Sequence, residues 1–121
     1  MIDYIPYKVV VVGDRGVGKT SIINKYIKDE FNMDIEPTTA VFFSSKNIVN
    51  DGNKPFQLEL WDIPGEEKMR ELTKIFLKDA IVFIFVYDVT NEESFERLKN
   101  SWVNYTREYI EKQRENFSES K

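Results

Sequence analysis

The sequence predicts an α/β fold in which a mostly parallel β-sheet contains one antiparallel hairpin and carries helices on both faces. Two apolar runs, Val9–Val12 and Ala80–Tyr87, are typical of parallel strands that are covered on both sides. Strand and helix patterns alternate along the chain in the order β-α-β-β-α-β-α. A glycine-rich segment, residues 13–20, follows the first apolar run and leads directly into a helical pattern.

The first half of the chain reads as strand, helix and hairpin. We expect the first helix to bury four apolar side chains, and Asn50–Asn53 is a strong turn signal between two strands. Alternation of apolar and polar residues after the turn indicates a half-buried strand. The predicted segments are a strand at Tyr7–Val12, a helix at Gly18–Lys28 burying Ile22, Ile23, Tyr26 and Ile27, a loop at Asp29–Pro37, a strand at Ala40–Val49, and a strand with Phe56, Leu58 and Leu60.

The second half reads as loop, helix, strand and helix. Asp62–Glu66 is a loop interrupted by proline and glycine, and Thr90–Glu93 fits a capping box. The chain turns polar after about Arg114, so we expect residues 115–121 to fray, within one domain that spans residues 1–121. The helical stripes are Met69, Leu72, Thr73, Phe76 and Leu77 before the Ala80–Tyr87 strand, and Phe95, Leu98, Trp102, Tyr105 and Tyr109 after it.

Composition narrows the classes of function. The chain has 17 basic and 21 acidic residues, a net charge of −4, so no basic excess points to nucleic acid. It has no cysteine and no histidine, which leaves positioning, a metal ion, carboxylates and positive charge as the means of catalysis. We find no signal-peptide pattern, no apolar run long enough to span a bilayer and no lipidation box, and we expect a cytoplasmic protein.

The segment Gly13–Thr20 fits the phosphate-binding loop pattern G-x-x-x-x-G-K-[ST]. The pattern predicts that backbone N–H groups curl around phosphate oxygens, aided by the dipole of the following helix. Lys19 would reach the β- and γ-phosphates, and the Thr20 hydroxyl would hold Mg²⁺. An ordinary glycine-rich turn explains the glycines but leaves Lys19 unexplained, because a helix N-terminus favours acidic residues.

Two further segments suit the same chemistry. Asp62 follows a strand where a carboxylate could hold Mg²⁺, and Gly65 could offer its N–H to a γ-phosphate. The plainer interpretation is a turn in which Asp62 caps the next helix. Thr38, in the loop before the second strand, could close over Mg²⁺ and the γ-phosphate, or it could be an ordinary strand-entry threonine, with Thr39 as a neighbouring alternative.

These residues resemble a small GTPase of the Ras superfamily, and more narrowly its Rab branch. Gly13–Thr20 resembles the family's phosphate loop, Pro37-Thr38 its switch I, and Asp62-Ile63-Pro64-Gly65 the D-x-x-G of its switch II. Leu60–Asp62 and Val86–Phe95 read much more like Rab than like other branches. The resemblance implies that Phe31 packs on the guanine. It also implies that an aromatic triad contacts effector proteins, namely Phe43, Trp61 and Phe76. For Phe43 and Phe76, packing within the fold is a nearly equal interpretation.

Three residues depart from the family pattern. Glu66 stands where a glutamine usually orients the attacking water, and Pro64 replaces a small residue with one that lacks an N–H. Arg15 stands where the family has a small or short residue. Our hypothesis is that Arg15 and Glu66 pair near the γ-phosphate and leave hydrolysis slow. The alternative is that Arg15 acts as an arginine finger in cis.

The resemblance covers about Tyr7 to Arg114, and the chain lacks the N-K-x-D and S-A-K motifs, the last two strands and the prenylated tail of a complete member. We therefore expect a fragment or truncated gene product, with membrane association only through a lipidated tail. The Ala80–Tyr87 strand should present an apolar open edge that favours self-association.

The sequence thus predicts a Rab-like molecular switch in vesicle trafficking that binds GTP or GDP with Mg²⁺ and hydrolyses GTP. The alternatives are a non-cycling interaction module, which would keep the effector surface without the nucleotide cycle, and a P-loop NTPase of another branch. The predicted nucleotide-binding residues are Asp14, Arg15, Gly16, Val17, Gly18, Lys19, Thr20, Ser21, Phe31, Thr38 and Gly65. The predicted catalytic residues are Lys19, Gly65 and Glu66, and the predicted metal ligands are Thr20, Thr38 and Asp62.

Overall fold

The computed structural model describes residues 3–28, 41–49, 52 and 54–119. Its elements are β1 (Ile5–Val12), α1 (Lys19–Lys28), β2 (Phe42–Ile48), β3 (Phe56–Asp62), the 3₁₀ turn η1 (Glu67–Met69), α2 (Arg70–Thr73), the 3₁₀ turn η2 (Lys74–Leu77), β4 (Val82–Phe85), α3 (Glu92–Arg97), the π-turn η3 (Leu98–Trp102) and α4 (Val103–Glu119). The predicted α/β class and the order of elements are confirmed.

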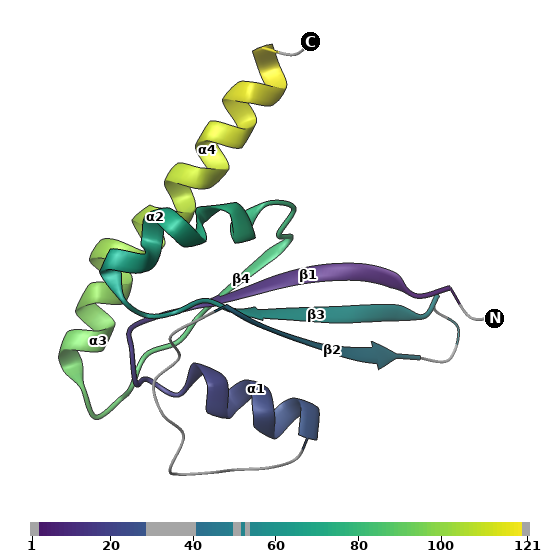
Figure 1. Ribbon diagram of the computed structural model, residues 1–121, viewed down its shortest axis with the longest axis horizontal. Helices are drawn as coiled ribbons and strands as arrows, with labels where there is room; N and C mark the ends of the chain where they lie inside the picture. Colours follow the sequence, from purple (N-terminus) through teal and green to yellow (C-terminus); the bar gives the residue numbers. More distant parts are fainter. Residues whose placement is uncertain (1–2, 29–40, 50–51, 53, 120–121) are drawn as a thin grey trace.

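Four strands form one sheet in the order β2-β3-β1-β4. β1 pairs in parallel with β3 and β4, whereas β2 and β3 form the predicted antiparallel hairpin. Because β1, β3 and β4 run the same way, their carboxyl ends lie at one edge of the sheet, as Figure 1 shows. The segments that follow these ends hold the candidate site.

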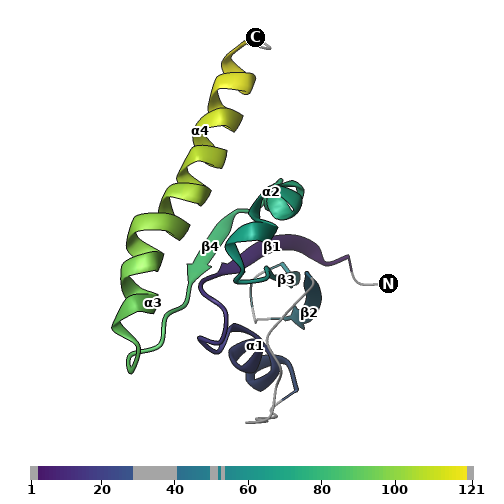
Figure 2. The same ribbon diagram turned by 60° about the vertical axis from the view of Figure 1, so that its left-hand side comes forward.

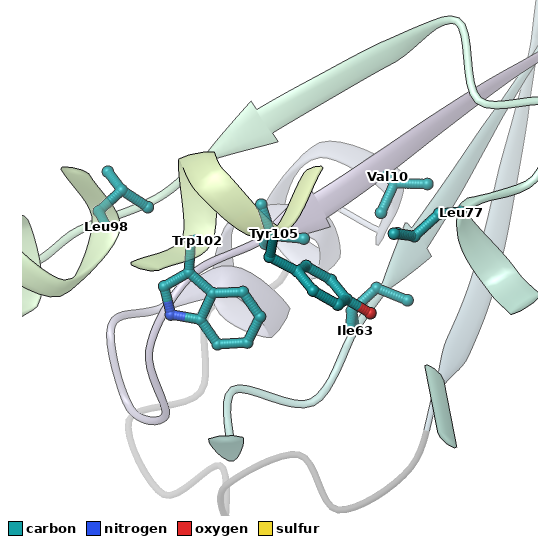
Figure 3. Packing of buried hydrophobic residues seen from close by; sticks show 7 residues of the cluster. Val10, Ile63, Leu77, Leu98, Trp102 and Tyr105 are labelled. Carbon is teal, nitrogen blue, oxygen red and sulfur yellow. The ribbon is translucent and has the colours of Figure 1, made fainter. Parts of the chain in front are cut away.

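Alternating residues of β1 build a separate core on each face of the sheet. Val9 and Val11 pack with Ile23 of α1 on one face. Val10 and Val12 pack on the other face, beneath α2, α3 and α4, which lie opposite α1 in Figures 1 and 2. Figure 3 shows the second core, where Trp102 and Tyr105 extend from the helix toward Ile63.

Several local predictions differ from the structure. Ile22 and Tyr26 are exposed, because α1 turns only its Ile23 side onto the sheet. The expected single helix after the D-x-x-G segment is broken into η1, α2 and η2, and its 3₁₀ turns leave Leu72 exposed while Thr73 is buried.

The start and the end of the last helical region also differ. Asn91, not Thr90, is the N-cap of α3, because the Thr90 hydroxyl donates instead to Asp88 Oδ1 at 2.6 Å. Helix α4 continues to Glu119, through residues for which we expected fraying. Its final turns extend away from the sheet in Figures 1 and 2. None of the helices in the described part of the chain is long and apolar enough for a bilayer span.

Candidate functional site

The segment between β1 and α1 is curled. Gly16 and Gly18 adopt φ angles of 79° and 104°, which side chains with a Cβ rarely tolerate. Helix α1 begins directly behind the curl, and its first-turn bond runs from the Ile22 N–H to the Gly18 carbonyl at 2.9 Å. The N-terminus of α1 therefore opens onto the carboxyl edge of the sheet, as an anion site requires.

Lys19 is buried under this loop. Its ammonium donates to the carbonyl oxygens of Gly13 at 3.0 Å and Asp14 at 2.9 Å, so the side chain folds back along the loop. Desolvation by burial lowers the pKa of Lys19, and the nearby carboxylates of Asp62 and Asp14 counteract this effect only in part. An anion bound at the loop would favour the charged form of this buried lysine.

Thr20 and Asp62 meet at the same rim. The Thr20 hydroxyl donates to Asp62 Oδ2, which joins the start of α1 to the end of β3. Asp62 is only 2 % exposed, so the strand end presents its carboxylate inside the site instead of capping a helix. A hydroxyl and a carboxylate are the oxygen ligands that Mg²⁺ prefers, so these residues fit a magnesium site. Over the described residues, no group of three or more acidic, histidine or cysteine side chains could hold a metal alone. A magnesium ion here would therefore need phosphate or water oxygens as well.

Gly65 lies directly against the backbone of the phosphate loop. A Cβ added to Gly65 would approach Arg15 N to 2.2 Å and the Asp14 carbonyl carbon to 2.4 Å. Only glycine allows this approach. The segment after β3 and the phosphate loop are thus in backbone contact, so a shift of one must displace the other.

Arg15 and Glu66 lie at the outer side of this contact. Arg15 Nη1 is 3.7 Å from Glu66 Oε1, and Lys68 Nζ is 3.3 Å from Glu66 Oε2. The Arg15 side chain is 57 % exposed, so the ion pair is screened by water and contributes little to stability. The expected pairing of Arg15 with Glu66 is present, and Lys68 joins it.

One aromatic side chain from each of β2, β3 and η2 joins a group of rings that pack together. The ring centroids of Phe43 and Trp61 are 4.9 Å apart, and those of Trp61 and Phe76 are 5.9 Å apart. Phe43 is 49 % exposed, whereas Trp61 and Phe76 also pack against the core beneath α2. Packing within the fold therefore applies to Phe76, and also to Trp61, whereas contact of the three rings with effectors stays a prediction.

Other predicted residues fall outside this rim. Phe31 and Thr38 lie outside the described residues. Ser21 faces a hollow of about 660 Å³ on the outer side of α1, whose lining also includes Val17, Gly18, Ile22, Lys25 and Tyr26.

Asp14 behaves differently from the rest of the loop. Its side chain is directed to the helices, where its carboxylate accepts from Trp102 Nε1 at 2.9 Å and from Arg97 Nε. Sequence reasoning missed Arg97 and the polar role of Trp102. Helical spacing places Trp102 in the core, but nothing in the spacing indicates which acceptor its N–H meets.

Comparison with known proteins places these observations in a family. The model of the Ras family matches residues 8–118. The chain is 35 % identical over 109 residues to the GTP-binding protein ypt3 of Schizosaccharomyces pombe, covering 90 % of this chain and 50 % of that protein. It is 39 % identical over 95 residues to the Ypt/Rab-type GTPase YPT7 of Saccharomyces cerevisiae, covering 78 % and 45 %. It is 38 % identical over 112 residues to the Ras-related protein RabC of Dictyostelium discoideum, covering 92 % and 57 %. The chain spans about half the length of these curated relatives.

Proposed function

The chain belongs to the Ras family, in its Rab-like branch, and from that premise we propose that it binds GTP or GDP with Mg²⁺ and hydrolyses GTP as a switch in vesicle trafficking. The observation that carries the proposal is the contact between Thr20 and Asp62 at the mouth of a curled loop that buries Lys19. These groups come from the start of α1 and the end of β3, and together they suit a magnesium-bound di- or triphosphate.

Lys19 supplies the fixed positive charge in this proposal. Its bonds to Gly13 and Asp14 hold the ammonium at the loop, so little reorganisation is needed when phosphate arrives. Phosphoryl transfer depends mainly on such positioning and charge stabilisation, which agrees with a chain that contains no histidine or cysteine.

Thr20 and Asp62 would hold the magnesium ion, with Thr38 as a further proposed ligand. The ion supplies charge neutralisation at the β- and γ-phosphates when it is bound. In the protein alone, the Thr20 hydroxyl donates to one oxygen of the buried Asp62 carboxylate. Magnesium binding must therefore compete with this hydrogen bond.

Gly65 would sense the γ-phosphate through its backbone N–H. Its contact with the loop at Arg15 means that a third phosphate changes the position of the segment leading to α2. We propose Glu66 as the residue that positions water, and that it does so poorly. An ionised carboxylate cannot donate to a γ-phosphate, and its pairing with Arg15 and Lys68 draws it outward. Slow hydrolysis follows.

Phe43, Trp61 and Phe76 are the proposed surface for effector and regulator proteins. Partly exposed aromatic rings that are already packed together lose little conformational freedom when a partner covers them. The group adjoins η2, so a change after Gly65 would reach it through the same short helices.

Self-association through the β4 edge is a further proposal. Over the described residues β4 is an edge strand and pairs only with β1. Its side chains Val82 and Ile84 are 45 % and 43 % exposed, and Ile81 just before it is 60 % exposed. An apolar edge with open main-chain groups is a template for pairing with a second copy.

Two measurements test the nucleotide cycle. Nucleotide retained by the purified chain, identified by mass with and without Mg²⁺, should be guanine nucleotide that is lost when Mg²⁺ is chelated. Single-turnover GTP hydrolysis should be slow, and both Glu66→Gln and Arg15→Gly should accelerate it. Slower reaction in both variants would overturn the proposed impairment and favour Arg15 as a finger in cis. Absence of any bound or exchangeable nucleotide would favour the non-cycling interaction module.

A further inference from the structure

The carboxylate of Asp14 ties the curled loop to the helical layer that α3, η3 and α4 form. Asp14 is 8 % exposed, and its two oxygens are bonded by different groups. Oδ1 accepts from the indole N–H of Trp102 at 2.9 Å, and Oδ2 accepts from Arg97 Nε. Hydrogen bonds to a charged acceptor are about twice as strong as neutral ones, so the loop is firmly attached at this point.

Trp102 reaches Asp14 from a π-turn. In η3 the Val103 N–H donates to the carbonyl of Leu98, five residues back, instead of four as in an α-helix. The wider turn allows Leu98 and Trp102 to be buried together, at 7 % and 0 % exposure. Such turns occur frequently at functional sites, and this one directs a polar indole edge at the phosphate loop.

The segment after Gly65 is attached to the same indole. The Arg70 guanidinium lies 4.0 Å from the Trp102 ring centroid and bonds the neighbouring Ser101 hydroxyl. Tyr105, one turn further on, donates from its hydroxyl to the Arg70 carbonyl at 2.9 Å. The start of α2 is therefore stacked on one side of Trp102 while the edge of the ring holds the loop.

A polar cavity of about 250 Å³ lies between these parts. It is lined by Asp14, Arg15, Gly65, Glu67, Arg70 and Arg97. Its walls thus combine the phosphate loop, the segment after β3 and helix α3. The phosphate loop and the start of α2 face each other across this cavity, whereas Trp102 is close-packed.

We propose that Trp102 is a positioning residue that couples the phosphate loop to the start of α2. It acts on nucleotide through Asp14, whose backbone carbonyl also accepts from Lys19. Rotation of Asp14 would move that carbonyl and the Arg15 N–H beside it, and so change the loop that receives the phosphates. The inference rests on the proposed nucleotide binding and adds to it a residue in the helical layer that contacts no phosphate.

The first arm of the test is spectroscopic. Trp102 and Trp61 are the two tryptophans, so Trp61→Phe leaves Trp102 as the single emitter. We expect the emission of Trp102 to change when Mg·GDP is added, and to change again with a non-hydrolysable GTP analogue. A buried ring that served the core alone would give no such response, because it is remote from solvent and ligand.

The second arm compares affinity with stability. Trp102→Phe keeps a smaller aromatic ring at this position and removes the indole N–H that donates to Asp14. We expect Mg·GDP to bind about tenfold more weakly, as for loss of one bond to a charged group. Thr106→Val is the matched control. It removes another hydrogen bond of a buried side chain, from the Thr106 hydroxyl to the Val103 carbonyl at 3.0 Å, one turn from Trp102 and within the helix itself. It should lower the melting temperature and leave GDP affinity unchanged.

Arg97→Ala covers the case in which Trp102→Phe does not fold, because Arg97 is about half exposed and its loss leaves the core intact. It should weaken Mg·GDP binding severalfold, since Asp14 then keeps only its bond to Trp102. This inference alone would be overturned by a combination of three results. The unmodified chain binds labelled GDP, the emission of Trp102 does not change, and the variants bind GDP with unchanged affinity. Failure of the unmodified chain to bind GDP would instead overturn the proposed function, and with it the inference.

Discussion

Replacing Gly65 by alanine would place a methyl group where the backbone of the phosphate loop already lies. The added Cβ would stand 2.2 Å from Arg15 N, 2.4 Å from the Asp14 carbonyl carbon and 2.7 Å from the Gly13 carbonyl oxygen. All three are backbone atoms, so none can swing aside as a flexible side chain would. The segment would have to retreat by roughly 1 Å to reach ordinary van der Waals contact.

Overpacking of this kind typically costs about 1–3 kcal/mol. In a chain of this size each kcal/mol lowers the melting temperature by about 4 °C, so we expect a decrease of about 4–12 °C. The separation should also weaken the proposed sensing of a third phosphate. Affinity for a non-hydrolysable GTP analogue should therefore decrease more than affinity for GDP.

Thermal or urea denaturation measures the first effect, and competition between the two nucleotides measures the second. Gly52→Asn is the matched control, because Gly52 has a φ of 81° with open space around it and asparagine tolerates that conformation. It should change stability by less than about 0.5 kcal/mol. If Gly65→Ala has the same melting temperature as the unmodified protein and the same ratio of affinities for the GTP analogue and GDP, the inferred contact between the phosphate loop and the segment after β3 is wrong.

Three other changes have defined outcomes. Asp62→Asn should raise the Mg²⁺ concentration needed to retain nucleotide, since it removes the charged oxygen beside Thr20; an unchanged Mg²⁺ titration would count against the metal assignment. Burial raises the pKa of Tyr105, so the folded state favours the neutral phenol. The free energy of unfolding should be unchanged below about pH 10 and should decline as the pH rises through the folded pKa. Urea titrations at about pH 9–11 measure this decline, and Tyr105→Phe should flatten it. Ile84→Lys should convert a self-associating chain to monomer, because it puts a charge on the exposed β4 edge, and sedimentation velocity measures this change. A monomeric unmodified chain would refute the proposed pairing.

Periodicity and motif spacing predicted the parts of the fold that local sequence determines. The apolar residues of β1 specify a strand covered on both faces, and Gly52 with its polar neighbours specifies the turn of the hairpin. The adjacency of Thr20 and Asp62 also followed from topology, because both lie at the carboxyl edge of parallel strands. Neither residue is near the other in sequence, so the parallel pairing is what makes the prediction work.

Sequence reasoning could not find interactions that depend on packing between layers. Ile22 and Tyr26 fit a helical stripe, yet α1 turns its Ile23 side onto the sheet and leaves them exposed. Thr90 fits a capping box, yet Asp88 competes for its hydroxyl. The bond between Asp14 and Trp102 joins residues 88 positions apart and depends on a π-turn that no residue pattern signals.

Titration of the purified chain with Mg·GDP, in parallel with Lys19→Met, measures whether the curled loop binds phosphate through Lys19. Methionine keeps the length of the side chain and removes the ammonium that lies at the loop. We expect one saturable, Mg²⁺-dependent site in the unmodified chain and binding about 10- to 100-fold weaker in the variant, as for loss of a hydrogen bond to a charged group. Equal affinity in the two proteins, or no binding by either, would contradict this expectation.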